Sequence, residues 1–134
     1  MSEINVAVKG ILIKNNQMLI VKRAAHDETG AGTWECVGGV MKFGESFEEA
    51  LQREFLEEVG LQVQVRKLLF STTFLTSATR QIVLLSFLCE CENMNVTLSG
   101  EHEEFRWAAK HQLLTLLPEP KLNDFIIYGV LDLL

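Results

Sequence analysis

Three glutamates near the middle of the chain have the spacing of cation ligands. Glu54, Glu57 and Glu58 stand at positions i, i+3 and i+4, so on an α-helix their carboxylates lie on one face, within reach of one ion. Clustered carboxylates repel one another unless a cation lies among them, and their hard oxygen atoms suit Mg²⁺ or Mn²⁺. Because Mg²⁺ usually binds substrate phosphates as well, the spacing favours a phosphate-binding metal centre. The competing interpretation is a solvated acidic helix face.

A helix that would carry these glutamates is marked at both ends. Ser46, followed three residues later by Glu49, forms a capping-box pattern. Gly60 stands where a left-handed C-terminal cap is expected. We therefore predict a helix over residues 47–59. Its apolar side chains recur at helical spacing and predict a stripe that faces a core: Phe47, Leu51, Phe55 and Val59.

The run from Gly39 to Leu61 follows the pattern G-x5-E-x7-R-E-U-x-E-E-x-G-U, where U is a bulky apolar residue. This pattern resembles the signature box of the Nudix hydrolases, which use divalent cations to cleave diphosphate linkages in nucleoside diphosphates joined to another group. The resemblance is strong over residues 34–61 and looser over most of the chain. Two positions depart from the family: Gly38 stands where many relatives have proline, and Phe55 stands where an aliphatic residue is usual. Neither departure removes a metal ligand.

The resemblance implies roles for the polar residues of the box. Glu57 and Glu58 would be the principal metal ligands. Glu54 would be a further ligand or the base that acts on water. Arg53 would join the catalytic set by pairing with a box carboxylate such as Glu45, which orients the loop against the helix.

Backbone and side-chain groups around the box complete the expected metal site. Gly38 and Gly39 are expected to permit a tight strand-to-loop turn, and Gly39 would offer its carbonyl to the metal. Family members often carry another functional glutamate on a loop before a late tryptophan. Here we expect Glu101 in that role, with Glu104 as the alternative. His102 is expected to be a loop or hydrogen-bonding residue.

Two residues before the box are candidates for substrate contact. Similar enzymes often place a basic residue against substrate phosphate at the end of the preceding strand, which here is Arg23. A structural or solvated role is the alternative for Arg23. Trp34 has a face that can stack on a base, although packing in the core or a loop competes with this interpretation. Phe74 and Phe43 are weaker stacking candidates.

The rest of the sequence predicts an α+β fold. Apolar and β-branched runs predict strands over residues 6–13, 18–21, 34–37, 62–74, 81–91 and 103–107, with a turn over 14–17, loops over 24–33 and 93–102, and a short strand around Val96. Helices are expected over residues 110–117, ended by Pro118 and Pro120, and 123–134, capped by Asn123. Without strict βαβ alternation, a mixed sheet is favoured. The resemblance implies the Nudix fold, a mixed β-sheet sandwiched between helices (α/β/α), as one domain over residues 1–134 with the Nudix box at 39–61.

The composition is typical of a globular protein. The 134 residues are 48% hydrophobic and 22% charged, which suits one domain with a proper core. The net charge of −6 argues against a nucleic-acid polymer as partner, because surfaces that bind such polymers are usually basic. A small nucleotide is compatible with this charge, since bound cations offset its phosphates.

Cysteine usage and hydropathy indicate the compartment. Cys36, Cys89 and Cys91 form an odd number without metal-ligand spacing, so free thiols in a reducing cytosol are expected. With no signal segment and no apolar run of about 20 residues, we expect a cytoplasmic protein that is not embedded in a membrane. The apolar residues 125–134 are expected to pack within their own domain, with a homodimer interface as the alternative.

The resemblance implies Mg²⁺-dependent (or Mn²⁺-dependent) hydrolysis of phosphoanhydride bonds. Marks of several subgroups are missing: residues 75–77 lack the proline of some ADP-ribose hydrolases, and Tyr128 is the only tyrosine. The expected substrates are therefore those of the MutT-like class, nucleoside or deoxynucleoside triphosphates. ADP-ribose and nucleotide sugars are the alternative substrates. A non-catalytic nucleotide-binding module is the rival class, and the retained Glu54, Glu57 and Glu58 argue against it.

Overall fold

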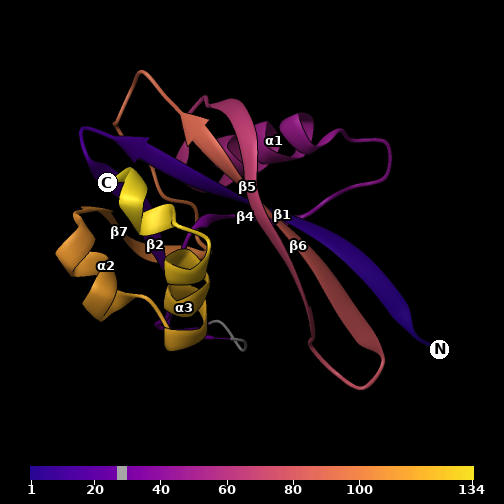
Figure 1. Cartoon of the computed structure of the whole chain (residues 1–134). Helices are drawn as coiled ribbons and strands as arrows, with labels where there is room; N and C mark the ends of the chain where they lie inside the picture. Colours follow the sequence, from indigo (N-terminus) through magenta and orange to yellow (C-terminus); the bar gives the residue numbers. More distant parts are fainter. Residues whose placement is uncertain (27–29) are drawn as a thin grey trace.

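The chain forms a mixed sheet with helices on both faces (Figure 1). The computed structural model describes residues 1–26 and 30–134, and residues 27–29 of the predicted loop lie outside those ranges. The strands are β1 (Glu3–Lys14), β2 (Gln17–Arg23), β3 (Trp34–Glu35), β4 (Val37–Val40), β5 (Gln64–Leu75), β6 (Arg80–Glu90) and β7 (His102–Ala108). The helices are α1 (Phe47–Val59), α2 (Lys110–Leu116), α3 (Glu119–Ile127) and the 3₁₀ helix η1 (Val130–Leu133). The predicted α+β arrangement is confirmed, and within the described ranges no helix is long and apolar enough to cross a membrane.

Strand β1 belongs to both halves of the sheet, one with β4, β5 and β6 and the other with β2, β3 and β7. The strand order is β3-β2-β1-β6-β5, with β4 also paired to β1 and β7 also paired to β2. β1 runs parallel to β6, whereas its pairs with β2 and β4 are antiparallel. Strand β4, which leads towards α1, and strand β2, which carries β7, therefore both lie beside β1.

The predicted hairpin at the start of the chain is confirmed. Asn15 and Asn16 join β1 to β2, and both have positive φ, 54° and 60°. A two-residue type I′ turn requires positive φ at both positions, and asparagine tolerates this conformation better than most residues. The turn therefore needs only these two residues of the predicted 14–17 segment.

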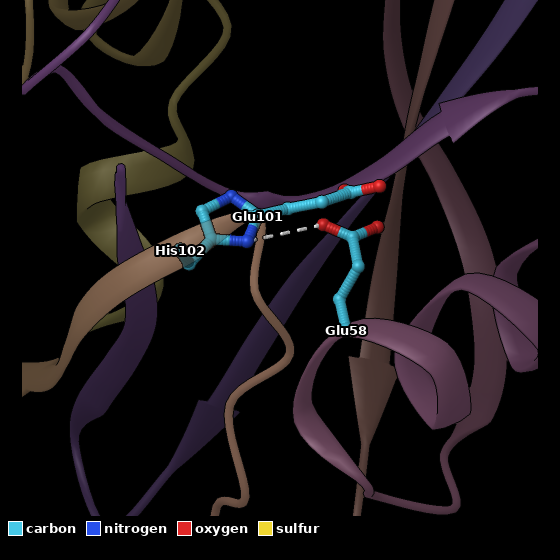
Figure 2. A group of neighbouring side chains, drawn as sticks. All are labelled: Glu58, Glu101 and His102. Carbon is cyan, nitrogen blue, oxygen red and sulfur yellow. Dashed lines mark ion pairs between the residues drawn. The ribbon is translucent and has the colours of Figure 1, made fainter. Parts of the chain in front are cut away.

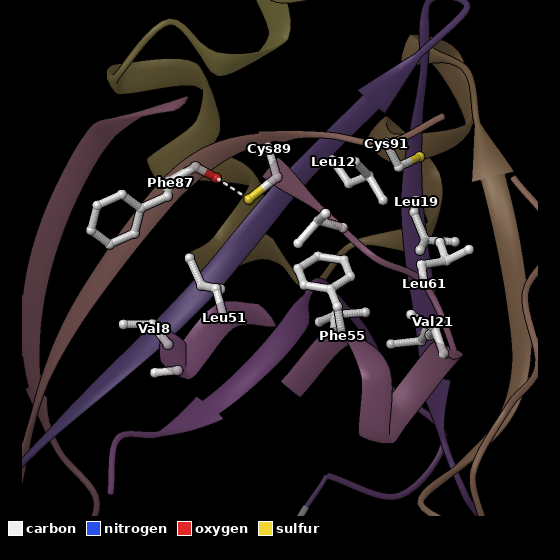
Figure 3. Packing of buried hydrophobic residues seen from close by; sticks show 14 residues of the cluster. Val8, Leu12, Leu19, Val21, Leu51, Phe55, Leu61, Phe87, Cys89 and Cys91 are labelled. Carbon is white, nitrogen blue, oxygen red and sulfur yellow. Dashed lines mark hydrogen bonds between the residues drawn. The ribbon is translucent and has the colours of Figure 1, made fainter. Parts of the chain in front are cut away.

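Two apolar clusters fill the space between the sheet and its helices. The cluster beside α1 includes Val8, Leu12, Leu51, Phe55, Val59 and Cys89 (Figure 3). The cluster beside α2, α3 and η1 includes Ile11, Trp34, Phe70, Leu113, Phe125 and Val130. The alternation along β1 explains the division, because successive side chains of a strand point to opposite faces. All three cysteines are buried and free, as the predicted free thiols require.

The helix that carries the glutamates has the predicted boundaries. Ser46 Oγ accepts from the backbone N–H of Glu49 (3.1 Å), and the Glu49 carboxylate accepts from the Ser46 N–H (2.9 Å). Gly60 ends the helix in the left-handed conformation, with φ of 68°. The predicted apolar stripe faces the core except at Phe47, which is 44% exposed and contacts Phe87 at 5.5 Å between ring centroids.

A glycine on β1 accommodates the unusual aromatic residue of the box. Phe55 is fully buried, and a Cβ added at Gly10 would overlap its ring. The space that an aliphatic residue would leave is therefore filled by a phenyl ring that lies against the bare backbone of β1. The departure at Phe55 and the glycine at position 10 are complementary.

Substituting Gly10 by alanine is expected to destabilise the protein by about 1–3 kcal/mol, the usual cost of overpacking a filled core. The measurement is the free energy of unfolding from denaturant titration. Gly100→Ala is the matched control, because among residues 1–26 and 30–134 a Cβ added there meets no heavy atom within 4 Å beyond its own chain neighbours. Equal stability of the two variants would show that Phe55 moves aside without cost.

The C-terminal helix differs from the prediction. The expected helix over residues 123–134 with Asn123 as N-cap is wrong: α3 begins at Glu119 and η1 follows after Gly129, whose φ is 71°. Pro118 is the N-cap and Pro120 lies in the first turn, where a missing N–H breaks no intrahelical hydrogen bond. The prolines that follow α2 thus also begin the next helix.

The segment between β6 and β7 also differs from the prediction. Residues 91–101 contain no strand, although the sequence predicts a short one around Val96. Val96 and Leu98 instead pack, partly buried, against the cluster beside α1. Their apolar character serves packing rather than strand pairing, a distinction that β propensity alone does not make.

Candidate active site

The C-terminal end of α1 is bound to the segment that precedes β7. The Thr97 N–H donates to the Val59 carbonyl (2.9 Å), and the Ser99 N–H donates to the Glu58 carbonyl (3.0 Å). The last turn of a helix leaves such carbonyls without intrahelical donors. These two hydrogen bonds bring the start of β7, and Glu101 with it, beside the box.

Glu58, Glu101 and His102 form a cluster at this junction (Figure 2). One ligand atom from each residue lies within 4.8 Å of the others. Glu58 and His102 are buried, whereas Glu101 is exposed. Among the described residues, Glu58 Oε2 and His102 Nδ1 are buried side-chain atoms without a hydrogen-bond partner. Buried polar atoms need partners, and two carboxylates with an imidazole are a donor set that fits a divalent cation.

The raised pKa of Glu58 also indicates that this cluster fits a divalent cation. Burial raises the pKa of its carboxyl well above the ordinary value of 4.5, and the neighbouring Glu54 and Glu101 carboxyls raise it further against the opposing charge of Lys9. A carboxyl in such surroundings is costly to ionise. A bound cation reverses this balance, because it is the largest local charge and favours the ionised form.

Glu54 lies against the backbone of β4. A Cβ added at Gly39 would be 2.6 Å from Glu54 Oε1, so only glycine leaves room for this carboxylate. The predicted tight turn at Gly38 and Gly39 is wrong, because both residues lie within β4 and pair with Lys9 and Val8 of β1. The glycines are needed for close approach, and the Gly39 carbonyl as a metal ligand stays a prediction.

The predicted pairing of Arg53 with Glu45 is confirmed. Arg53 Nε and Nη2 donate to the two Glu45 oxygens at 2.6 and 3.0 Å. The Nη1 atom donates to Glu54 (2.9 Å) and Glu57 (3.3 Å). Hydrogen bonding to Arg53, aided by the Lys42 backbone, lowers the pKa of Glu45 to about 2. The guanidinium therefore joins the loop before α1 to two of the three helix glutamates.

The three predicted metal ligands on α1 have different surroundings. Glu58 points into the buried cluster, and Glu54 lies beside it with a side chain that is 12% exposed. Glu57 is 54% exposed and pairs with Arg53. The structure thus places Glu54 and Glu101 each beside Glu58, while Glu57 remains a predicted ligand on the outer side of the helix.

Glu35 lies at the centre of the site and is not among the residues predicted from the sequence. Its carboxylate accepts from His102 Nε2 (2.8 Å), Lys9 Nζ (3.3 Å) and Arg23 Nε (3.2 Å). Burial alone would raise the pKa of Glu35, but the hydrogen bond from His102 and the charges of Lys9 and Arg23 lower it to about 2. A signal was present in the sequence, because Lys9 interrupts the apolar run of β1 and a lysine there needs a partner.

The remaining candidates have separate outcomes. Arg23 lies at the site, bound to Glu35. Trp34 is buried in the cluster beside α3, and the Arg106 guanidinium lies 5.5 Å from its ring centroid. The structure therefore favours the packing interpretation of Trp34 over base stacking. Glu104 is exposed, with ion pairs to Lys22 and Arg106, and lies outside the cluster that contains Glu101.

A cavity of about 790 Å³ opens beside these residues. The apolar residues Ile82, Leu84, Phe74 and Phe125 contribute to its walls, which extend from the sheet to α3. Polar groups from Thr72, Ser86, Lys121 and Asp124 also line it. Glu35, Arg23 and Gly39 belong to both the cavity lining and the site. Phe43, the other weak stacking candidate, is fully exposed.

Comparisons with known proteins agree with this geometry. Residues 3–128 match the family model described as the NUDIX domain. The chain is 30% identical over 116 residues to the nucleoside triphosphatase NudI of Enterobacter sp. (strain 638), covering 79% of this chain and 82% of that protein. It is 30% identical over 115 residues to a MutT-like protein of Streptomyces ambofaciens, covering 86% and 70% of the two chains. The crystal structure of the MutT protein from Methanosarcina mazei Go1 superposes with a TM-score of 0.85 at 22% identity, covering 98% and 96%. The chain therefore belongs to the Nudix hydrolase family.

Proposed function

We propose that this Nudix hydrolase cleaves nucleoside or deoxynucleoside triphosphates, with release of pyrophosphate, and that it uses Mg²⁺ or Mn²⁺. The observation that carries the proposal is the Glu58–Glu101–His102 cluster, with its unpartnered buried atoms, joined through Glu35 to a cavity of about 790 Å³. Ligand sites are typically concave and mostly apolar with a few polar groups. The cavity has this character, and the acidic residues lie next to it.

The residues that would hold the cation are Glu54, Glu57, Glu58 and the Gly39 carbonyl, with Glu101 beside them. When bound, a divalent cation neutralises phosphate oxygens and makes water more acidic. The chain itself positions the reactants, which carries much of the rate enhancement in phosphoryl transfer. Arg53 fixes Glu54 and Glu57, and Arg23 lies where the cavity meets the site.

In the proposed reaction, a water oxygen attacks a phosphorus of the anhydride that joins the α- and β-phosphates, and the bond from that phosphorus to the bridging oxygen breaks, so that monophosphate and pyrophosphate separate. The water loses a proton to a carboxylate of the chain. Glu54 and Glu101 are the candidate bases, since each lies next to Glu58. Glu101 is the more exposed of the two, which gives it ready access to water.

The cavity supports a nucleoside on the substrate. Its apolar walls can receive a base, and Asp124 with Lys121 on α3 can hydrogen-bond the base or sugar edge. NudI, which spans nearly the same length, is a nucleoside triphosphatase. This relative favours the triphosphate proposal over ADP-ribose and nucleotide sugars.

Turnover on a panel of substrates tests the proposal. With Mg²⁺, nucleoside and deoxynucleoside triphosphates are expected to yield monophosphate and pyrophosphate, detected by chromatography. Chelation with EDTA is expected to lower the rate by at least about 100-fold, because the metal contributes several kcal/mol to the transition state. Returning Mg²⁺ should restore it. Turnover of ADP-ribose or nucleotide sugars alone would overturn the substrate class, and folded protein without any turnover would favour a nucleotide-binding module.

A further inference from the structure

The Glu35 carboxylate holds the His102 ring in one orientation, and both of its oxygens accept hydrogen bonds. Its Nε2 atom lies 2.8 Å from Glu35 Oε2, and its side chain is 2% exposed. Glu35 Oε1 accepts from the cations Lys9 and Arg23, so Glu35 is ionised and acts only as an acceptor. The hydrogen on the His102 ring must therefore reside on Nε2, which donates it to Glu35.

The other ring nitrogen is then a bare acceptor aimed at the acidic cluster. In a neutral imidazole, a proton on Nε2 leaves a lone pair on Nδ1. Figure 2 shows Nδ1 facing Glu58 Oε1, at 3.6 Å. Within residues 1–26 and 30–134, Nδ1 has no hydrogen-bond partner. When Glu58 is ionised, Nδ1 and Oε1 are two acceptors that face each other, an arrangement that needs a positive charge near both; without such a charge, Glu58 keeps its proton.

The separation of these atoms is close to that of two ligands of one ion. Two atoms that bind Mg²⁺-sized cations at 2.0–2.1 Å lie about 2.9 Å apart when adjacent and about 4.2 Å apart when opposite. The Nδ1 to Oε1 distance of 3.6 Å is about 0.7 Å longer than the adjacent value, so shared binding requires a small approach of the two side chains. The same distance is too long for a hydrogen bond from a protonated Nδ1. A doubly protonated imidazole between Glu35 and Glu58 is the competing arrangement.

We propose that His102 is itself a ligand of the metal centre through Nδ1, together with Glu58 and Glu101, and that Glu35 is the positioning residue that fixes its tautomer. This inference rests on the proposed metal-dependent function. A carboxylate that accepts the remote N–H of a ligating histidine is a common support for metal-bound imidazoles. Lys9 and Arg23 hold that carboxylate in place.

A histidine ligand changes which divalent cation the site prefers. Imidazole suits transition metals better than Mg²⁺, which prefers oxygen ligands. A histidine in the ligand set should therefore favour Mn²⁺ over Mg²⁺ relative to a site made of carboxylates alone. Replacing His102 by asparagine is expected to weaken Mn²⁺ binding by about 10–100-fold, the range seen when metal-site support is removed, and to weaken Mg²⁺ binding less.

Pulsed electron paramagnetic resonance of Mn²⁺ bound to the wild-type protein, without nucleotide, tests ligation directly. A directly coordinated imidazole gives a nitrogen hyperfine coupling, and labelling histidine with ¹⁵N should change it. The chain has three histidines, so His111→Gln, at an exposed position on α2, is the matched control and should keep the coupling. His102→Asn should lose it, and Glu35→Gln should weaken Mn²⁺ binding with the coupling altered.

Mn²⁺ binding and the nitrogen coupling together distinguish a failure of the His102 assignment from a failure of the proposed function. Tight Mn²⁺ binding without a nitrogen coupling in the wild-type protein would overturn the role of His102 and leave the metal-dependent hydrolase standing. A coupling that persists in a folded His102→Asn variant would also overturn it. Failure of the wild-type protein to bind Mn²⁺ would remove the metal-dependent function and the ligand inference together. Circular dichroism of each metal-free variant checks that it is folded.

Discussion

Replacing Glu58 by glutamine is expected to lower kcat by at least about 100-fold while making the metal-free protein more stable near neutral pH. The loss of activity follows because a neutral amide is a weaker ligand than a carboxylate, and Glu58 belongs to the cluster that would hold the cation. The gain in stability follows because Glu58 is buried beside Glu54 and Glu101, where its ionised form is costly. Activity and stability should therefore change in opposite directions.

The raised pKa of Glu58 determines how the stability of the metal-free protein changes with pH. Burial raises the pKa of Glu58 in the folded protein, so above its ordinary value of 4.5 the unfolded chain loses a proton that the folded protein still holds. Under that condition the free energy of unfolding falls as pH rises. Metal-free wild-type protein should lose stability between pH 5 and pH 8 in EDTA, and Glu58→Gln should lose less. Calorimetric melting at several pH values within this range measures the difference.

Glu57→Gln is the matched control for this experiment. The resemblance assigns Glu57 as a principal metal ligand, so its substitution is also expected to lower kcat by about 100-fold or more. Its side chain is 54% exposed, so it should leave the pH dependence of stability close to that of the wild-type protein. If both variants kept near-normal kcat, the ligand assignments on α1 would be wrong. Equal melting curves for Glu58→Gln and wild type would contradict the burial argument alone.

The features predicted correctly from the sequence depend on short-range interactions. The capping box of Ser46 and Glu49 and the left-handed Gly60 are set within one helical turn, so residue type and spacing suffice to find them. The asparagine hairpin turn is local in the same sense. The C-terminal helix was misplaced for a related reason: Pro118 and Pro120 are compatible with the end of one helix and the first turn of the next, and sequence spacing does not separate these roles.

The parts of the site that escaped prediction depend on contacts between distant segments. His102 and Glu35 are 67 positions apart, and only the pairing of β2 with both β3 and β7 brings them together. The resemblance located Glu101 because the family pattern supplies that long-range information. It contained nothing about Glu35, so the carboxylate that organises His102, Lys9 and Arg23 emerged only from the folded arrangement.

Replacing Arg53 by lysine is expected to lower kcat by about 10–100-fold, although the positive charge is kept. Lysine cannot reproduce the fork through which Arg53 binds both oxygens of Glu45 and also reaches Glu54 and Glu57. Without these hydrogen bonds, Arg53 no longer holds the loop before α1 and the two helix glutamates in fixed positions. Kinetic constants measured over a series of Mg²⁺ concentrations should show the defect as a lower kcat that excess metal does not fully restore.

The surface pair of Arg66 and Glu90 provides the control for Arg53. Arg66 Nη2 lies 2.7 Å from Glu90 Oε2, and both side chains are about half exposed, 51% and 53%. Arg66→Lys should change kcat less than about twofold, since exposed ion pairs contribute little. The double variant Glu45→Gln with Arg53→Lys should be barely worse than Arg53→Lys alone, because both substitutions break one shared contact and their effects should not add. Additive losses would mean that Arg53 acts through a second route, such as direct contact with the substrate phosphates, and not through the loop that it fixes.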